Sequence, residues 1–116
     1  MKRIMLRAKL HRLSVTERCI EYEGSLTVDS ALLSEADMLP GERVQVVNVM
    51  NGARFETYVL EGERDSGVVC LNGAAARLAE IGDLIIVIAY GIVDEGELKG
   101  FKPNVVLVDA KNRIKK

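Results

Sequence analysis

The fold is decided by residues 43–60, which read Arg-Val-Gln-Val-Val-Asn-Val-Met-Asn-Gly-Ala-Arg-Phe-Glu-Thr-Tyr-Val-Leu. The valine-rich residues 43–49 predict a β-strand, and residues 53–60 predict a second strand that returns beside it. Between them, Asn51-Gly52 is strongly favoured in two-residue type I′ turns, because both central residues of that turn need a positive φ. This stretch therefore predicts a β-hairpin.

Short apolar segments continue on both sides of the hairpin. Further strands are expected at residues 3–16, 19–23, 26–28, 68–71, 84–89 and 103–108, with a bulge at Leu10-His11-Arg12 in the first. The apolar run 84–89 is typical of a strand buried on both faces. Two short helices are expected, one capped by Asp29-Ser30 and one over residues 74–79. This pattern predicts a mainly all-β fold, a small closed or nearly closed β-barrel with short helices.

Size and charge narrow the class of protein. The 116 residues have room for one domain, which we expect to span residues 1–116 with a flexible tail at 110–116. Hydrophobic residues make up 48% and aromatic ones only 4%, so the core must be aliphatic. A net charge of −1 lacks the concentrated basic face that nucleic-acid binding needs, and no nucleic-acid partner is expected.

The reactive residue types are few. Cys19 and Cys70 have no metal-like spacing and are expected to be free thiols in a reducing compartment. His11 is the only histidine, which argues against a histidine-based zinc site, and we expect no metal. There is no apolar run of transmembrane length and no signal-peptide pattern, so a cytoplasmic protein without a membrane partner is expected.

Several residues could carry chemistry, each with an ordinary alternative. Alternation places Arg54, Glu56 and Tyr58 on one face of their strand, either a solvated face or an anion clamp beside a phenolic proton donor. Lys9 is either a surface lysine or part of a site. Residues 72–75 are either a turn or a source of backbone N–H groups for a carboxylate. Gly24-Ser25 alone is ordinary turn chemistry.

Taken together, these segments resemble one family. Five separated motifs follow one another in the order and spacing of bacterial aspartate 1-decarboxylase, and the resemblance covers about residues 1–109. The motifs are Lys9-Leu10-His11-Arg12, Tyr22-Glu23-Gly24-Ser25, Asn48-Val49-Met50-Asn51-Gly52-Ala53-Arg54, Thr57-Tyr58 and Asn72-Gly73-Ala74-Ala75-Ala76.

The resemblance implies a fold, an assembly and an activity. The family folds as a double-psi β-barrel and forms a homotetramer with active sites between neighbouring subunits. It is made as an inactive proenzyme, a zymogen, whose autocatalytic cleavage between Gly24 and Ser25 gives a β chain, 1–24, and an α chain, 25–116. The α chain begins with a covalent pyruvoyl group derived from Ser25. This carboxy-lyase converts L-aspartate to β-alanine and CO₂, feeding pantothenate and coenzyme A biosynthesis.

The resemblance also implies roles for individual residues. Ser25 supplies the ketone that forms a Schiff base with the substrate amine, and Tyr58 returns the proton; both are the catalytic residues. Cleavage involves Gly24 and Ser25, assisted by Thr57 and Asn72, either spontaneously or with a helper protein. Substrate binding falls to Lys9, Arg54, Thr57, Gly73, Ala74 and Ala75, with His11 and Tyr22 in support.

Two alternatives remain beside this interpretation. The same chemistry could act on another acidic amino acid such as glutamate, because one methylene changes discrimination by only about 10–200-fold. The chain could instead be a non-catalytic oligomeric β-barrel that binds a partner. In that case Gly24-Ser25 is a turn, and Arg54 and Tyr58 are surface residues.

Overall fold

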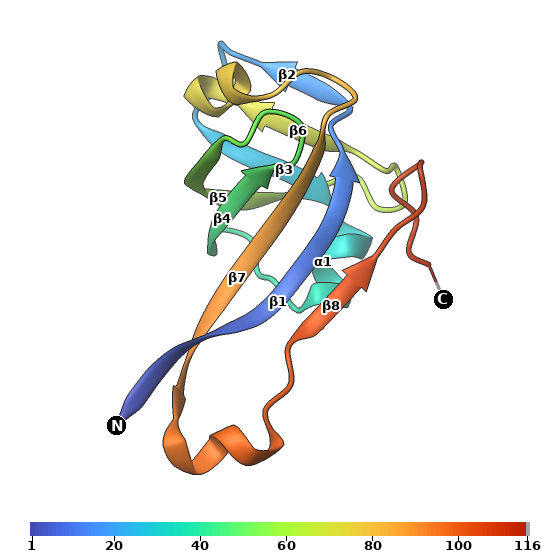
Figure 1. Cartoon of the computed structure of the whole chain (residues 1–116). Helices are drawn as coiled ribbons and strands as arrows, with labels where there is room; N and C mark the ends of the chain where they lie inside the picture. The colour runs from blue at the N-terminus through green and yellow to red at the C-terminus, as the bar shows by residue number, and fades with distance from the viewer. Residues whose placement is uncertain (116) are drawn as a thin grey trace.

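The computed structural model describes residues 1–115 and is built mainly from strands, with short helices (Figure 1). This confirms the predicted all-β class. The strands are β1 (Lys2–Ser14), β2 (Glu17–Cys19), β3 (Ser25–Asp29), β4 (Arg43–Asn48), β5 (Arg54–Gly62), β6 (Val69–Asn72), β7 (Leu84–Asp94) and β8 (Asn104–Leu107). The helices are α1 (Ser30–Ala36) and the 3₁₀ segments η1 (Gly73–Leu78) and η2 (Glu95–Gly100).

The strands form one mixed sheet in the order β2-β6-β3-β5-β4-β7-β1-β8. Three pairs are parallel and join segments far apart in the chain: β1 with β8, β2 with β6, and β3 with β5. The remaining pairs are antiparallel. Figure 1 shows β1 and β7 continuing together away from the other strands into an arm that ends at the N-terminus and η2.

The core is aliphatic, as the composition predicted. Its fully buried large side chains include Leu10, Leu26 and Leu71. The prediction that residues 84–89 are buried on both faces is wrong, because burial alternates along β7. Ile85, Val87 and Ala89 are buried, while the side chains between them are only partly covered on the outer face of the sheet.

The central hairpin is confirmed, but its turn differs from the prediction. Strand β4 pairs with β5 from Arg43 opposite Tyr58 to Val47 opposite Arg54, so five residues lie between the strands. Only Gly52 of the two turn residues has a positive φ, 78°.

Local hydrogen bonds explain the longer loop. The side-chain oxygen of Asn48 accepts the Met50 N–H at 2.8 Å, and that of Asn51 accepts the Ala53 N–H at 2.8 Å. The Val49 N–H donates to the Leu84 carbonyl at 2.9 Å, which draws Val49 away from β5 to the start of β7. Asparagine side chains thus replace the backbone geometry of a two-residue turn.

Of three further local predictions, two are confirmed and one is wrong. The bulge is confirmed, since the β1–β7 register shifts between Leu10 and Leu13 and Arg12 has φ 61°. The Asp29 cap is also confirmed, because its carboxylate accepts the Ala31 N–H at 2.8 Å. The extended piece predicted at 19–23 is wrong: β2 ends at Cys19, and turns and bends lead to Ser25.

The C-terminal segment differs from the predicted flexible tail over residues 110–115. Asn112 is 1% exposed, and its side chain accepts the Ser14 N–H at 2.8 Å and donates to the carbonyls of Ser14 and Gly67, each at 2.9 Å. Val108 and Ile114 form a β-bridge. The amide satisfies backbone groups at the end of β1 and in the loop before β6, and so holds this segment against the sheet. Lys116 lies outside the described residues.

No helix within residues 1–115 has the length and apolar character needed to cross a membrane.

Replacing Asn112 with Ala should lower the free energy of unfolding by about 1–3 kcal/mol, because the buried Gly67 carbonyl and two partly buried backbone groups of Ser14 lose their partner. Chemical denaturation would measure this. Asn104→Ala is the matched control, since that exposed side chain makes one hydrogen bond, to the Glu35 carbonyl. Equal effects of the two substitutions would contradict a docked C-terminal segment.

Candidate functional site

Ser25 is the first residue of β3 and is fully buried. The antiparallel β3–β6 register sets it opposite Asn72, whose side-chain NH₂ donates to Ser25 Oγ at 2.9 Å. The Ser25 hydroxyl in turn lies 3.4 Å from the Glu23 carbonyl oxygen. A buried hydroxyl is thereby held by two contacts at the residue that directly follows Gly24 in the chain.

Asn72 connects a small polar cluster on the side of β3 and β6 opposite the core. Its NH₂ also donates to Thr27 Oγ1 at 3.0 Å, and its Oδ1 accepts from the Cys70 thiol at 3.3 Å. Sequence reasoning missed Thr27 and Cys70. Strand alternation could have found them, because Ser25 and Thr27 share one face of β3, and Cys70 and Asn72 share the same face of β6.

Gly73 packs against the segment that precedes Ser25. It has φ 62°, and a Cβ at this position would lie 2.7 Å from the Gly24 Cα and 2.9 Å from the Tyr22 carbonyl oxygen. The start of η1, with the exposed Ala74 and the buried Ala75, is therefore in direct contact with residues 22–24. Only glycine fits at position 73.

Gly24 is not under the same constraint. Its φ is not in the left-handed region, and a Cβ there would meet no atom within 4 Å. In the uncut chain the steric need for glycine lies at Gly73 instead.

Tyr58 lies beside Ser25. Leu26 is in parallel register with Val59, so one residue earlier on both strands Ser25 is level with Tyr58. Because Leu26 and Val59 both face the core, Ser25 and Tyr58 share the opposite face, on strands about 4.8 Å apart. Thr57 points to the core side, and Arg54, Glu56 and Tyr58 are all exposed on one face, as alternation predicted.

Lys9 and Arg54 lie at other places in the sheet than Ser25. Strand β1, which carries Lys9, is four positions from β3 in the sheet, and Arg54 lies four residues along β5 from Tyr58, about 13 Å. Lys9 and Gln45 flank Ile88 from either side, and Gln45 Oε1 accepts from Arg54 Nη1 at 2.9 Å. The predicted residues thus form two groups. The Ser25 group consists of Ser25, Asn72 and Tyr58. The outer-face group lies farther along the sheet around Gln45 and includes Lys9 and Arg54.

His11 belongs to the outer-face group. It follows Lys9 on the same face of β1, and it is partly buried. Its buried Nδ1 has no hydrogen-bond partner among residues 1–115. Burial, and then the positive charges of Lys9 and Arg12, lower the pKa of the imidazole below its ordinary value. The ring is therefore neutral at physiological pH.

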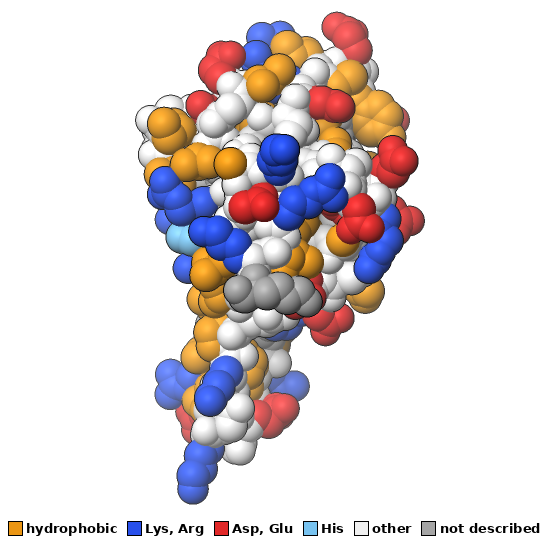
Figure 2. Space-filling view, turned by 90° about the vertical axis from the view of Figure 1, so that its right-hand side faces the viewer, with side chains coloured by type: hydrophobic (Ala, Val, Ile, Leu, Met, Phe, Trp, Pro, Cys, Tyr) orange, Lys and Arg blue, Asp and Glu red, His pale blue; other side chains and the backbone are white. Residues whose placement is uncertain are grey.

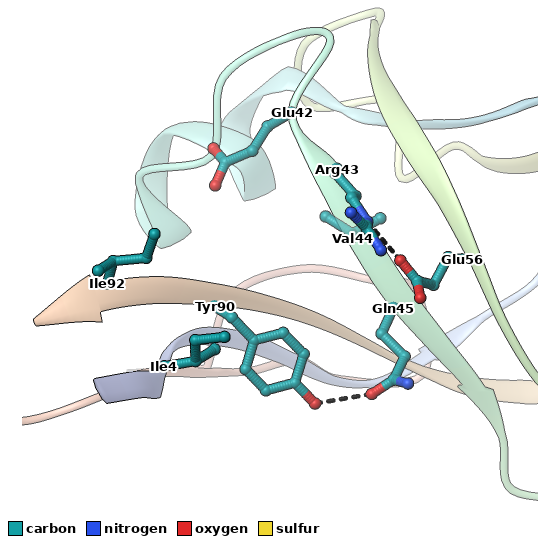
Figure 3. Close-up of a pocket in the computed structure, with 8 residues that line it drawn as sticks. All are labelled: Ile4, Glu42, Arg43, Val44, Gln45, Glu56, Tyr90 and Ile92. Carbon is teal, nitrogen blue, oxygen red and sulfur yellow. Dashed lines mark hydrogen bonds and ion pairs between the residues drawn. The ribbon is translucent and has the colours of Figure 1, made fainter. Parts of the chain in front are cut away.

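A groove of about 460 Å³ lies over β4 and β7 (Figure 3), and Ser25 is not among its lining residues. Its polar side chains are already paired: Tyr90 OH donates to Gln45 Oε1 at 2.7 Å, Arg43 pairs with Glu56, and Glu42 pairs with Arg7 outside the groove. No predicted site residue lines it. The lining residues are Ile4, Glu42, Arg43, Val44, Gln45, Glu56, Tyr90 and Ile92.

Within residues 1–115, no three His, Cys, Asp or Glu side chains are close enough together to hold a metal ion. The chemistry available around Ser25 is that of a hydroxyl, an amide, a phenol and a thiol.

Fold and site define a small mainly β protein with a buried serine hydroxyl at a strand start after a glycine. The family model described as "Aspartate decarboxylase" matches residues 1–115. The chain is 53% identical to aspartate 1-decarboxylase of Thermoanaerobacter pseudethanolicus, over 97% of each chain. It is 58% identical to the Pelotomaculum thermopropionicum protein of that name, over 95% of this chain and 83% of the relative. For the Syntrophus aciditrophicus protein, also so named, identity is 54% over 99% of each. The chain therefore belongs to the aspartate decarboxylase family.

Gly73→Ala should destabilise the protein more than Gly52→Ala. Both glycines have a positive φ, but only at Gly73 would the added Cβ clash, with backbone atoms of residues 22 and 24. Strain at φ costs roughly 1–3 kcal/mol in both variants, and the clash adds roughly 1–3 kcal/mol at Gly73 alone. Thermal unfolding of the two variants measures the difference. Equal midpoints would show that η1 does not press on the segment before Ser25.

The lowered pKa of His11 should make the protein less stable in mild acid. A histidine whose folded pKa is depressed contributes stability above its unfolded pKa, and this contribution is lost as the pH falls through the folded pKa. NMR titration of the imidazole would give the folded pKa directly. Lys9→Met should raise it, but not fully to the ordinary value, because burial remains the larger cause. An unchanged pKa in Lys9→Met would contradict this assignment.

Proposed function

We propose that this protein is a pyruvoyl-dependent aspartate decarboxylase that converts L-aspartate to β-alanine and CO₂ for pantothenate biosynthesis. Membership of the family and the aspartate 1-decarboxylase names of its relatives support the reaction. The observation that carries the proposal is the buried Ser25 hydroxyl, which follows Gly24 in the chain and accepts a hydrogen bond from the Asn72 side-chain NH₂.

Self-cleavage would begin with attack of Ser25 Oγ on the Gly24 carbonyl carbon. A C–O bond forms, the Gly24–Ser25 C–N bond breaks, and the hydroxyl proton passes to the freed nitrogen, leaving an ester. Elimination then removes the Ser25 Cα proton and breaks the Cβ–Oγ bond. It forms a Cα=Cβ double bond, releases the Gly24 carboxylate and leaves an enamine that tautomerises to an imine. Water hydrolyses the imine to the ketone and ammonia. Asn72, which already donates to Oγ, is the proposed aid to this step. Thr57 is the second proposed aid, although its side chain is on the core-facing side of β5 in the uncut chain.

The residues around Ser25 fit a small covalent ketone. The position is buried, an amide NH₂ already donates to its oxygen, and a phenol stands on the same face one strand away. The pyruvoyl group supplies an electron sink for the bond that loses CO₂. Tyr58 is the proposed proton donor to Cα after CO₂ leaves.

The charges of the substrate carboxylates suggest which residues bind them. Cations should hold the β-carboxylate that is retained, because gripping the departing carboxylate would stabilise the ground state. Arg54 is the proposed clamp, with Lys9 near it and Thr57 as a further contact. The backbone of Gly73, Ala74 and Ala75 would complete the pocket, with His11 and Tyr22 in support.

The active site is proposed to form between subunits of a homotetramer. Two observations support this: Lys9 and Arg54 lie away from Ser25 in one subunit, and the outer face exposes large apolar side chains. Ile4 is 75% exposed and Ile92 70%. Figure 2 shows hydrophobic side chains at the surface of the narrow half of the molecule. A second subunit would bury this surface and bring its cations to Ser25.

Both cysteines are free, which fits a reducing cytoplasm as the proposed location. Maturation is proposed to occur either unaided or with a helper protein, and purified chain aged alone distinguishes the two.

The proposal predicts that purified chain held warm, alone or with cell extract, converts to fragments 1–24 and 25–116, with the larger blocked to N-terminal sequencing. Denaturing mass spectrometry follows the conversion, and CO₂ release from aspartate follows activity. Ser25→Ala should stay uncut, folded and at least 10³-fold less active. An active Ser25→Ala protein would refute the mechanism.

Two further measurements separate the alternatives. A higher kcat/KM for glutamate than for aspartate would change the substrate but keep the chemistry. Chain that stays intact even with cell extract, and releases no CO₂, would favour a non-catalytic barrel.

A further inference from the structure

We propose that Cys70 is a positioning residue for self-cleavage: its thiol fixes the Asn72 amide so that the NH₂ side faces the Ser25 hydroxyl. This inference rests on the proposed cleavage at Ser25. It assigns a role to a buried thiol that neither the substrate nor the proposed chemistry touches.

Both ends of the Asn72 side-chain amide, the oxygen and the NH₂ group, have hydrogen-bond partners in this cluster. Cys70 Sγ is 3.3 Å from Asn72 Oδ1, while Asn72 Nδ2 is 2.9 Å from Ser25 Oγ and 3.0 Å from Thr27 Oγ1. Thr27 is paired with Cys70 and Ser25 with Asn72 across the β3–β6 ladder, so strand register holds all four side chains together.

The orientation of the amide matters for the nucleophile. In the orientation found, an N–H of Asn72 occupies one lone pair of Oγ, and the Ser25 hydroxyl hydrogen is left to point toward the Glu23 carbonyl, 3.4 Å away. In the reverse orientation Asn72 Oδ1 would accept that hydrogen and hold the hydroxyl toward the amide. The NH₂ group would then face the sulfur, which is a weak acceptor. The thiol proton therefore favours the orientation found.

The thiol is in the right state to donate. Cys70 is 7% exposed, and burial, followed by the nearby Glu17 and Cys19, raises the pKa of its thiol. It therefore stays protonated at neutral pH. Its other acceptor, the Leu71 carbonyl, is farther away at 4.0 Å.

The test compares cleavage rates of uncut, folded protein followed by denaturing mass spectrometry. Cys70→Ala should cleave about tenfold more slowly than the unsubstituted chain, the factor expected for loss of one hydrogen bond of ordinary net strength. Cys70→Ser keeps a donor at the same place and should cleave within about threefold of the unsubstituted rate. A merely structural thiol would not be rescued selectively by the smaller, more polar serine.

Two controls separate positioning from packing. Leu71→Val trims a buried side chain on the opposite face of β6, and should lower the unfolding midpoint without slowing cleavage of the folded protein. Cys19→Ala removes the exposed thiol and should cleave normally. Equal rates for Cys70→Ala and the unsubstituted chain, or a Cys70→Ser variant as slow as Cys70→Ala, would overturn the inference. Failure of the unsubstituted chain to cleave, both alone and with cell extract, would refute the proposed function itself.

A second measurement applies even if Cys70→Ala does not fold. In uncut Cys19→Ala, Ser25→Ala protein, the only S–H stretching band belongs to Cys70. Adding Asn72→Ala should move this infrared band to higher frequency, because the thiol loses its acceptor. An unmoved band would overturn the inference.

Discussion

The antiparallel register that sets Ser25 opposite Asn72 is the constraint on which the site depends. It buries a hydroxyl at the start of β3 and supplies the amide that satisfies it. The same two strands bring Thr27 and Cys70 to that amide, and the parallel β3–β5 register brings Tyr58 level with Ser25. Slipping either register by one residue would turn the hydroxyl into the aliphatic core.

The strand order of the mixed sheet also explains why Lys9 does not lie beside Ser25 in this chain. Strand order places Lys9 four positions from Ser25, and the outward face that carries Lys9 and Arg54 also carries exposed isoleucines. Cations and apolar side chains on one face are what an interface between subunits would use. The groove around Tyr90 and Gln45 lies on this outer face too, but its polar side chains already have partners within this chain.

Local patterns in the sequence predicted much of this fold. The β4–β5 hairpin, the Asp29 cap, the bulge at Arg12 and the shared face of Arg54 and Tyr58 all follow from short-range periodicity or capping, and all were found. The family motifs identified the segments of the candidate site.

The features that the sequence did not predict depend on contacts between segments far apart in the chain. Val49 leaves the hairpin for the start of β7, and Asn112 docks on Ser14 and Gly67, neither of which a local pattern shows. Partial exposure along β7 depends on what covers the sheet from outside. Cys70 and Thr27 become neighbours of Ser25 only through the β3–β6 register, although alternation on each strand was readable.

The N-terminal 24 residues contribute two strands to the sheet: β1 pairs with both β7 and β8, and β2 pairs with β6. If the chain is cut after Gly24, these strands remain in place, yet they no longer belong to the same molecule as their neighbours. Renaturation from denaturant would then be a second-order encounter of two peptides, dependent on concentration, whereas the newly made chain folds alone. Such a protein can reach its structure efficiently only once, before the peptide bond is broken.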